Sequence, residues 1–211
     1  MRTKYAIPFF AGKIGHLEKQ WIQTEFILVL GFIIVPSSSV LVMPTAKGEK
    51  DHFNLPINKK SVFAGYARIT LFIAAIVCFF YGKNQVDPIY PREGIIWLSV
   101  AFALGALYYY FRVYFGKVTP EEITERSKLG KAIGMYILPQ WIYEDKLYEL
   151  AKDAGYTYKE KFGSNWREDI AEQSIPKEKI PLLYALSLFD YMIHPTDEMG
   201  NHLNRVDAMY N

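Results

Sequence analysis

The sequence has little cysteine and lacks the short motifs that carry known chemistries. Cys78 is the only cysteine, so no intramolecular disulfide can form, and a disulfide-stapled secreted domain is excluded. Glycine-rich phosphate loops, nucleophile elbows and Cys/His zinc patterns are also missing. No stripe of basic and aromatic residues marks a nucleic-acid surface. We therefore expect no cofactor and no nucleic-acid partner. The sequence also favours a non-enzymatic role over a catalytic one.

Acidic residues are missing from residues 1–17, whose basic residues are Arg2, Lys4, Lys13 and His16. Mitochondrial presequences share this basic, acid-poor composition, although the segment has few serine, threonine and arginine residues to support that assignment. A cleaved secretory signal is not expected, because the first long apolar run begins only at Phe26. Mitochondrial and bacterial inner membranes both remain open as the location.

Charge divides the chain into two halves. Residues 1–116 contain 12 Lys/Arg and 6 Asp/Glu, whereas residues 117–211 contain 12 Lys/Arg and 16 Asp/Glu. The net charges are thus +6 and −4, which is typical of a basic membrane-associated half followed by a solvated half. We predict a basic N-terminal segment over residues 1–25, for which an interfacial position is one option. A membrane domain over residues 26–116 and a soluble helical domain over residues 117–211 would follow it.

Two apolar stretches predict a transmembrane helical hairpin. Ile69–Gly82 and Gly94–Phe111 are separated by a polar link, Lys83–Glu93. A helix needs about 20 mostly apolar residues to cross about 30 Å of hydrocarbon, so we place the spans at residues 61–82 and 94–115. No segment of the chain predicts a strand, and the expected fold class is all-α.

Small and aromatic residues support this hairpin. Ser61 with Gly65, and Ala101 with Gly105, have the small-xxx-small spacing that lets helices approach closely in lipid. Aromatic residues near the ends of the second span are expected to act as interfacial anchors. These residues are Trp97, Tyr108, Tyr109, Tyr110 and Tyr114.

A third apolar run, residues 26–43, contains Pro36 near its middle. It predicts either a kinked third span or a re-entrant helix-break-helix segment, because proline frees backbone groups that lipid cannot satisfy. With three spans the two sides carry nine and six Lys/Arg, and with two spans they carry thirteen and two. The positive-inside rule favours two spans, the uncharged length favours three, and both place the C-terminal domain on the matrix or cytoplasmic side.

Two arginines lie within or beside the predicted spans. An antiparallel hairpin brings Arg68, near the start of one span, to the same membrane face as Arg112, near the end of the other. Two guanidinium groups at one face could hold a lipid phosphate, although an arginine near a span end also extends its side chain toward the interface.

Four short helices are expected after residue 116. Thr119 followed by Pro120 is a strong helix start, and that helix ends before Pro139. The others are predicted over residues 141–154, with Gly155 as a stop, over residues 164–172 and over residues 181–193. The last is apolar on so many sides that it should be buried.

The best candidate metal ligands are His194, Glu198 and His202, spaced four and four residues apart. On a continuous helix they would share one face and could ligate zinc or iron. Pro195 and Gly200 argue against such a helix, so a polar tail is the competing interpretation.

Together these features predict a non-catalytic accessory subunit of a larger membrane complex, in an energy-transducing inner membrane of the respiratory-chain or ATP-synthase type. Its partners would be other membrane-protein subunits and phospholipids, anionic ones in particular. Two alternatives stay open. One is a small lipid-binding membrane enzyme that uses Arg68 and Arg112, and the other is a component of a bacterial secretion or conjugation machine.

Overall fold

The computed structural model describes residues 6–29, 32–44, 49–86, 92–171 and 175–210. The chain divides into two compact units, an N-terminal unit, Met1–Val118, and a C-terminal unit, Thr119–Asn211. Each unit has its own set of elements and its own core.

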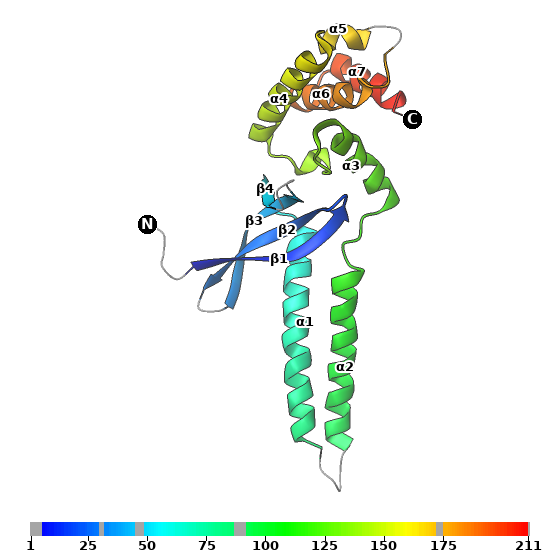
Figure 1. The fold of residues 1–211 in the computed structure, drawn as a ribbon. Helices are drawn as coiled ribbons and strands as arrows, with labels where there is room; N and C mark the ends of the chain where they lie inside the picture. Colours follow the sequence, from blue (N-terminus) through cyan, green and yellow to red (C-terminus); the bar gives the residue numbers. More distant parts are fainter. Residues whose placement is uncertain (1–5, 30–31, 45–48, 87–91, 172–174, 211) are drawn as a thin grey trace. The chain divides into compact units, whose positions relative to one another are not determined.

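The N-terminal unit combines a four-stranded sheet with two long helices (Figure 1). Its strands follow one another as an antiparallel meander, in the order β1-β2-β3-β4. The elements are β1 (Ala6–Leu17), β2 (Gln20–Val29), β3 (Phe32–Pro44), β4 (Lys50–Leu55), α1 (Lys59–Asn84) and α2 (Arg92–Val113).

The sheet contradicts the all-α prediction. The run over residues 26–43 is neither a third span nor a re-entrant helix, because its described residues, 26–29 and 32–43, belong to β2 and β3, which pair with each other as antiparallel strands. The run holds seven valines and isoleucines, and such β-branched residues favour strands. A short apolar run cannot be assigned to a helix or a strand by periodicity alone. The length of the run and its lack of charge therefore did not distinguish a membrane helix from two strands.

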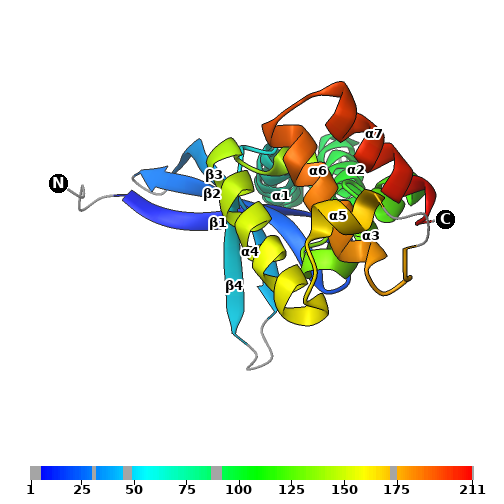
Figure 2. The ribbon, with the colours of Figure 1, turned by 90° about the horizontal axis from the view of Figure 1, so that it is seen from above.

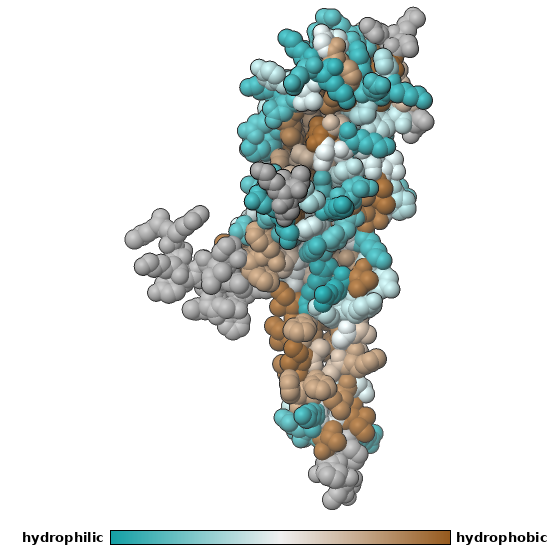
Figure 3. All heavy atoms as spheres, in the orientation of Figure 1, coloured by the Kyte–Doolittle hydropathy of each residue, from teal (hydrophilic) through white to brown (hydrophobic). Residues whose placement is uncertain are grey.

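Helices α1 and α2 agree with the predicted hairpin, since the expected spans at residues 61–82 and 94–115 fall largely within them. Both are long and apolar enough to cross a membrane, with mean hydropathies of 2.0 and 1.6 over 18 residues. Only 11% of each of these windows is buried. Figure 3 shows the resulting apolar surface along the hairpin. Within the described ranges no other helix meets both the length and hydropathy criteria.

One face of the sheet packs on the N-terminal end of α1. Ile22, Phe26 and Leu41 are fully buried, as is Ala64 of α1. Gly65 makes this approach possible, because a Cβ at this position would lie 2.8 Å from the ring of Phe26. Sheet and helix thus share one core.

Buried hydroxyl groups join the same elements. The Thr24 hydroxyl donates to the Ser61 oxygen over 2.8 Å, and the Ser61 hydroxyl donates to the Gly12 carbonyl over 2.7 Å. Thr24 also lies 3.0 Å from the Ser39 hydroxyl, which accepts from the Asn58 N–H. The Asn58 side chain in turn caps α1 by accepting from the Ser61 N–H. Strands β1, β2 and β3 are therefore tied to the first turn of α1.

Every regular element that the structure describes in the C-terminal unit is a helix. Helix α6 contacts α3, α4 and α7 and is seen among the other helices in Figure 2. Its elements are α3 (Pro120–Ile133), a short 3-10 turn (Pro139–Trp141), α4 (Glu144–Phe162), α5 (Trp166–Ala171), α6 (Ile180–Ile193) and α7 (Asp197–Ala208).

Helix starts were predicted better than helix ends in this unit. The predicted start of α3 is confirmed, because the Thr119 hydroxyl accepts from the Glu122 N–H and Pro120 opens the helix. The buried helix over residues 181–193 is also confirmed as α6, whose residues Ile180 and Leu182–Phe189 are buried. The predicted stop at Gly155 is wrong. Helix α4 continues to Phe162 and ends at Gly163, which adopts the left-handed conformation with φ of 68°.

Replacing Gly12 with alanine should unfold the junction between β1 and α1. Gly12 has a φ of 71°, and a Cβ there would overlap the Ser61 carbonyl. The left-handed backbone costs about 1–2 kcal/mol for alanine, and a lost buried hydrogen bond adds roughly 1–3 kcal/mol. Hydrogen exchange of the full chain in detergent should show lost protection over β1 and the first turn of α1.

Gly163→Ala is the matched control. Gly163 also has a positive φ, but within the described part of the chain no neighbouring atom lies within 4 Å of where an added Cβ would be. Its effect should be limited to the backbone cost and to the region around α4 and α5. Equal loss of protection in the two variants would contradict the close approach of Gly12 and Ser61.

Candidate functional site

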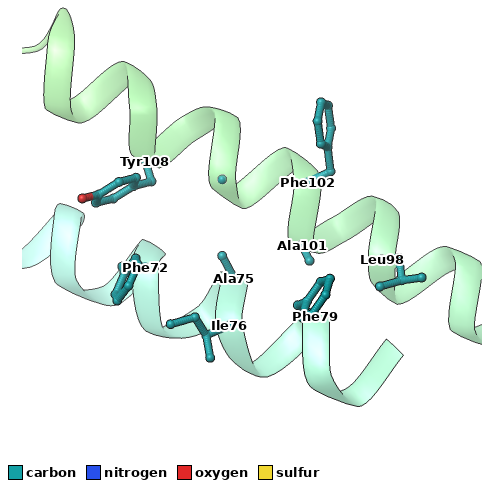
Figure 4. A pocket seen from close by; sticks show the side chains of 9 residues that line it. Phe72, Ala75, Ile76, Phe79, Leu98, Ala101, Phe102 and Tyr108 are labelled. Atoms are coloured by element: carbon teal, nitrogen blue, oxygen red, sulfur yellow. The ribbon is translucent and has the colours of Figure 1, made fainter. Parts of the chain in front are cut away.

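An apolar groove runs between α1 and α2. It has an open volume of about 500 Å³, and its residues come from both helices (Figure 4). The nine lining residues are Phe72, Ala75, Ile76, Phe79, Leu98, Ala101, Phe102, Gly105 and Tyr108. We call this feature the hairpin groove.

Small residues separate aromatic ones along the hairpin groove. Phe79 lies next to Ala101 of the opposite helix, whereas Phe72 and Tyr108 lie together at one end (Figure 4) with ring centroids 5.6 Å apart. Gly105 leaves a free position, because no atom of the described residues lies within 4 Å of where its Cβ would be. The groove therefore offers an apolar, small-residue floor between aromatic walls.

The predicted interfacial aromatics lie toward the two ends of α2. Trp97 packs edge-on against Tyr81 of α1, with ring centroids 5.2 Å apart. At the other end, Tyr114 stacks on Tyr110 and meets Tyr109 edge-on. Trp97, Tyr109, Tyr110 and Tyr114 are exposed, whereas Tyr108 is half-buried and lines the hairpin groove. An anchoring role at a membrane interface stays a prediction for these residues.

Arg68 binds two backbone carbonyls. Its Nε donates to the Phe111 carbonyl over 2.9 Å, and one terminal nitrogen donates to the Lys13 carbonyl over 2.9 Å. Phe111 lies in the last turn of α2, where carbonyls lack intrahelical partners. Lys13 lies where the β1–β2 register shifts, so it sits at an irregularity of the ladder. Arg68 consequently joins α1, α2 and β1, and we call these two hydrogen bonds the Arg68 clamp.

Arg68 and Arg112, the two arginines of the lipid-phosphate hypothesis, have different hydrogen-bond partners. The expected position is reproduced, because Arg68 reaches the turn of α2 that contains Arg112. Arg112 is exposed and its terminal nitrogen donates to the Tyr108 hydroxyl over 3.2 Å. Arg68 has a structural role that the sequence did not indicate, and its binding of a phosphate stays a hypothesis.

The candidate metal ligands fall on two helices. His194 is the C-terminal cap of α6, whereas Glu198 and His202 belong to α7, which starts after the capping residue Thr196. The continuous helix that would have aligned all three is absent. Among the described residues, no group of three or more His, Cys, Asp or Glu side chains is arranged to hold a metal ion.

A buried polar cluster links α4, α5 and α6 in the C-terminal unit. The Asp169 carboxylate accepts hydrogen bonds from Tyr158, from Ser164 over 2.6 Å and from Lys179 over 2.6 Å. Burial would raise the pKa of this carboxyl, but the three donors outweigh it and lower the pKa to about 2. A general base works best with a pKa near the operating pH, so this cluster is suited to holding helices together rather than to proton transfer.

A fully buried arginine has a similar structural role. Arg126 of α3 donates to the Tyr136 carbonyl over 2.7 Å and pairs with Glu122 at 3.1 Å. Burial lowers the pKa of this guanidinium, whereas the Glu122 carboxylate raises it. Sequence reasoning missed both this residue and Asp169, because the partners of Asp169 are spread over residues 158–179 and only the fold brings them together.

Comparisons with protein-family models, curated proteins and solved structures give no match to this chain.

Replacing Arg68 with glutamine should destabilise the N-terminal unit by roughly 2 kcal/mol. Glutamine is too short and has too few donors to reach both carbonyls, and hydrogen bonds to charged groups contribute about 1.5–3 kcal/mol. Arg112→Gln is the control, for which we expect a change within about 0.5 kcal/mol, as at other exposed positions. Thermal unfolding in detergent measures the difference, and equally small effects would contradict the clamp.

The same two variants test the lipid-phosphate hypothesis. Native mass spectrometry should show less bound anionic phospholipid if the two guanidinium groups hold its phosphate. Unchanged bound lipid in both variants would exclude this role.

Acid should weaken the C-terminal unit through Asp169. Its folded-state pKa of about 2 lies below the unfolded value of about 3.9. The carboxylate therefore stabilises the fold above about pH 4, and this contribution is lost as the pH falls toward 2. Asp169→Asn should be less stable at neutral pH and should lose part of this pH dependence.

The control for this prediction is Asp153→Asn, because Asp153 is an exposed carboxylate of the neighbouring helix α4. Urea unfolding at pH 6 and pH 3 can be followed by the two tryptophans of this unit, with the two in the N-terminal unit replaced by phenylalanine. The same pH dependence in both variants would show that Asp169 does not carry it.

Proposed function

We propose that the chain is a non-catalytic, membrane-anchored accessory subunit of a larger membrane complex. In this proposal α1 and α2 cross the bilayer as a hairpin, and a transmembrane helix of another subunit packs into the hairpin groove. The observation that carries the proposal is the groove, with its apolar lining and the open position at Gly105.

A helix fits the chemistry of the groove better than a polar ligand does. Association of helices within lipid depends on close packing, since lipid and side chains are equally apolar. Ala75, Ala101 and Gly105 allow a partner backbone to approach, and the aromatic rings beside them offer large contact areas. Near its middle the hairpin has no charged residue that would direct a polar substrate into the groove.

The rest of the N-terminal unit supports a scaffold role. The Arg68 clamp joins both helices to β1, and the hydroxyl network fixes the start of α1 on the sheet. A hairpin held in this way presents one defined groove, which reduces the conformational entropy lost on binding. The C-terminal unit has a core of its own around the buried helix α6. In this proposal the hairpin anchors that unit to the membrane.

The alternative of a lipid-binding enzyme is less well supported. It requires Arg68 to hold a headgroup, whereas two donors of Arg68 are already used on carbonyls. The energy-transducing inner membrane and the orientation of the C-terminal unit stay predictions from the charge pattern. A secretion or conjugation component would differ only in the identity of the partner subunits.

Gly105→Leu tests the proposal. The leucine would fill the open position and block a partner helix, while the hairpin itself has room for the new side chain. We expect about tenfold less co-purified partner after affinity purification of the full chain in mild detergent. A tenfold loss of affinity corresponds to about 1.4 kcal/mol of binding free energy. Expression and thermal stability should be preserved.

Ala103→Leu is the matched control, because Ala103 is an exposed residue of α2 that does not line the groove. It should retain the partner. Purification of the unmodified chain as a monomer, or retention of the partner by Gly105→Leu, would overturn the proposal. A homodimer would assign the groove to a second copy of the chain.

A further inference from the structure

The far end of the sheet is apolar over both paired strands of the β2–β3 hairpin. Residues 26–35 read F-I-L-V-L-G-F-I-I-V and contain no charged or hydrogen-bonding side chain. β1 runs beside β2 here, with Phe9 opposite Phe26. We call Phe9, Phe10, Ile27 and Val35, the exposed apolar residues described here, the apolar sheet end.

Phe9 is exposed on one face of the sheet, and Phe10, Ile27 and Val35 are exposed on the other. Ile27 and Val35 lie opposite each other in the register and are 36% and 51% exposed. Phe9 is 41% exposed and shares the face on which Phe26 is buried against α1. Exposed apolar residues gathered in this way indicate an interaction surface.

Polar groups mark where this surface stops. The Glu25 carboxylate accepts from the Ser38 hydroxyl over 2.9 Å on the neighbouring strand. At the opposite end of β2, the Lys13 ammonium lies 3.7 Å above the Trp21 ring, and the Lys50 ammonium lies 5.6 Å from the same ring. The sheet therefore changes along its length from a cationic and aromatic end to an uncharged one.

The fold fixes the apolar sheet end beside the proposed membrane helices. The hydroxyl network and Phe26 hold the sheet on the first turns of α1. In Figure 1 the described ends of β2 and β3 slant downward, and α1 and α2 also run downward from the sheet. Any bilayer crossed by α1 is thus adjacent to these residues without a linker between them.

We propose that the apolar sheet end lies in the interfacial layer of the bilayer that α1 and α2 cross, as a second, monotopic membrane contact. This inference rests on the membrane spans of the proposed function. Its occupant is lipid, because the sheet is fixed next to the proposed spans and carries apolar side chains on both faces.

Backbone chemistry limits the depth of this contact. β4 pairs with β3 only over Ser39–Pro44, so in the described part of the chain the outer edge of β3 before Ser39 has no strand partner. An open sheet edge does not occur in the hydrocarbon core, where nothing satisfies its N–H and C=O groups. Water and headgroups satisfy them in the interfacial layer, so the contact reaches about 5–10 Å in depth, as for other interfacial elements.

Depth-dependent fluorescence quenching tests this contact on the full chain. In a Cys78→Ala background, single variants Val35→Cys, Phe102→Cys and Asp51→Cys are labelled with the fluorophore NBD. The labelled chains are reconstituted in phosphatidylcholine and phosphatidylglycerol vesicles that contain spin-labelled lipids. Phe102 is 81% exposed near the middle of α2, and Asp51 is an exposed residue of β4.

We expect shallow spin labels to quench the probe at position 35 and deep ones to quench the probe at position 102. The probe at position 51 should remain accessible to aqueous iodide. Ile27→Cys, on the same face, should repeat the result of Val35→Cys and guards against local unfolding in one variant.

Quenching by lipid at position 102 without any at positions 35 and 27 would overturn this inference and leave the membrane spans in place. No lipid quenching at any position would overturn the spans and this inference together. If the probe at position 35 is shielded only at high protein concentration in detergent, a second copy of the chain covers the surface, and the lipid contact is wrong.

Discussion

The Arg68 clamp is the interaction on which the N-terminal unit depends. One guanidinium group on α1 satisfies a carbonyl in the last turn of α2 and another in β1. Both acceptors lie where regular hydrogen bonding stops, at a helix end and at a register shift of the sheet. Arginine suits this position because its planar, always charged group carries five donors in a fixed geometry. The clamp and the buried hydroxyl groups of Thr24 and Ser61 hold sheet and hairpin as one body.

Two of the four residues that the sequence assigned to helix pairing contact the sheet instead. Ser61 and Gly65 were expected to face a second helix, but Ser61 binds the Gly12 carbonyl and Gly65 packs on Phe26. Ala101 and Gly105 line the groove between the helices, where Gly105 has no close neighbour. The first pair thus serves the contact with the sheet, and the second leaves the groove open for a partner.

Sequence patterns predicted most helices of this protein but not α7 and not the sheet. Helix starts such as Thr119-Pro120 depend on local hydrogen bonds, and α6 is uniformly apolar, so both could be recognised without the fold. Strands β2 and β3 form an apolar run whose alternation is hidden, since its β-branched residues would also suit a membrane helix. Helix α7 was missed for a different reason, because its capping residue Thr196 follows a proline within a polar tail. The Asp169 cluster and the Arg68 clamp depend on tertiary contacts and have no local pattern to predict them.

The central claim is that a clamped hairpin presents a groove to another transmembrane helix. The most direct measurement is an electron cryo-microscopy map of the full chain, purified with its partners in lipid nanodiscs. We expect helical density from another subunit packed over Ala101 and Gly105, with the Arg68 side chain on the Phe111 carbonyl. A groove filled only by lipid acyl chains, or hairpin helices separated from the sheet, would contradict it.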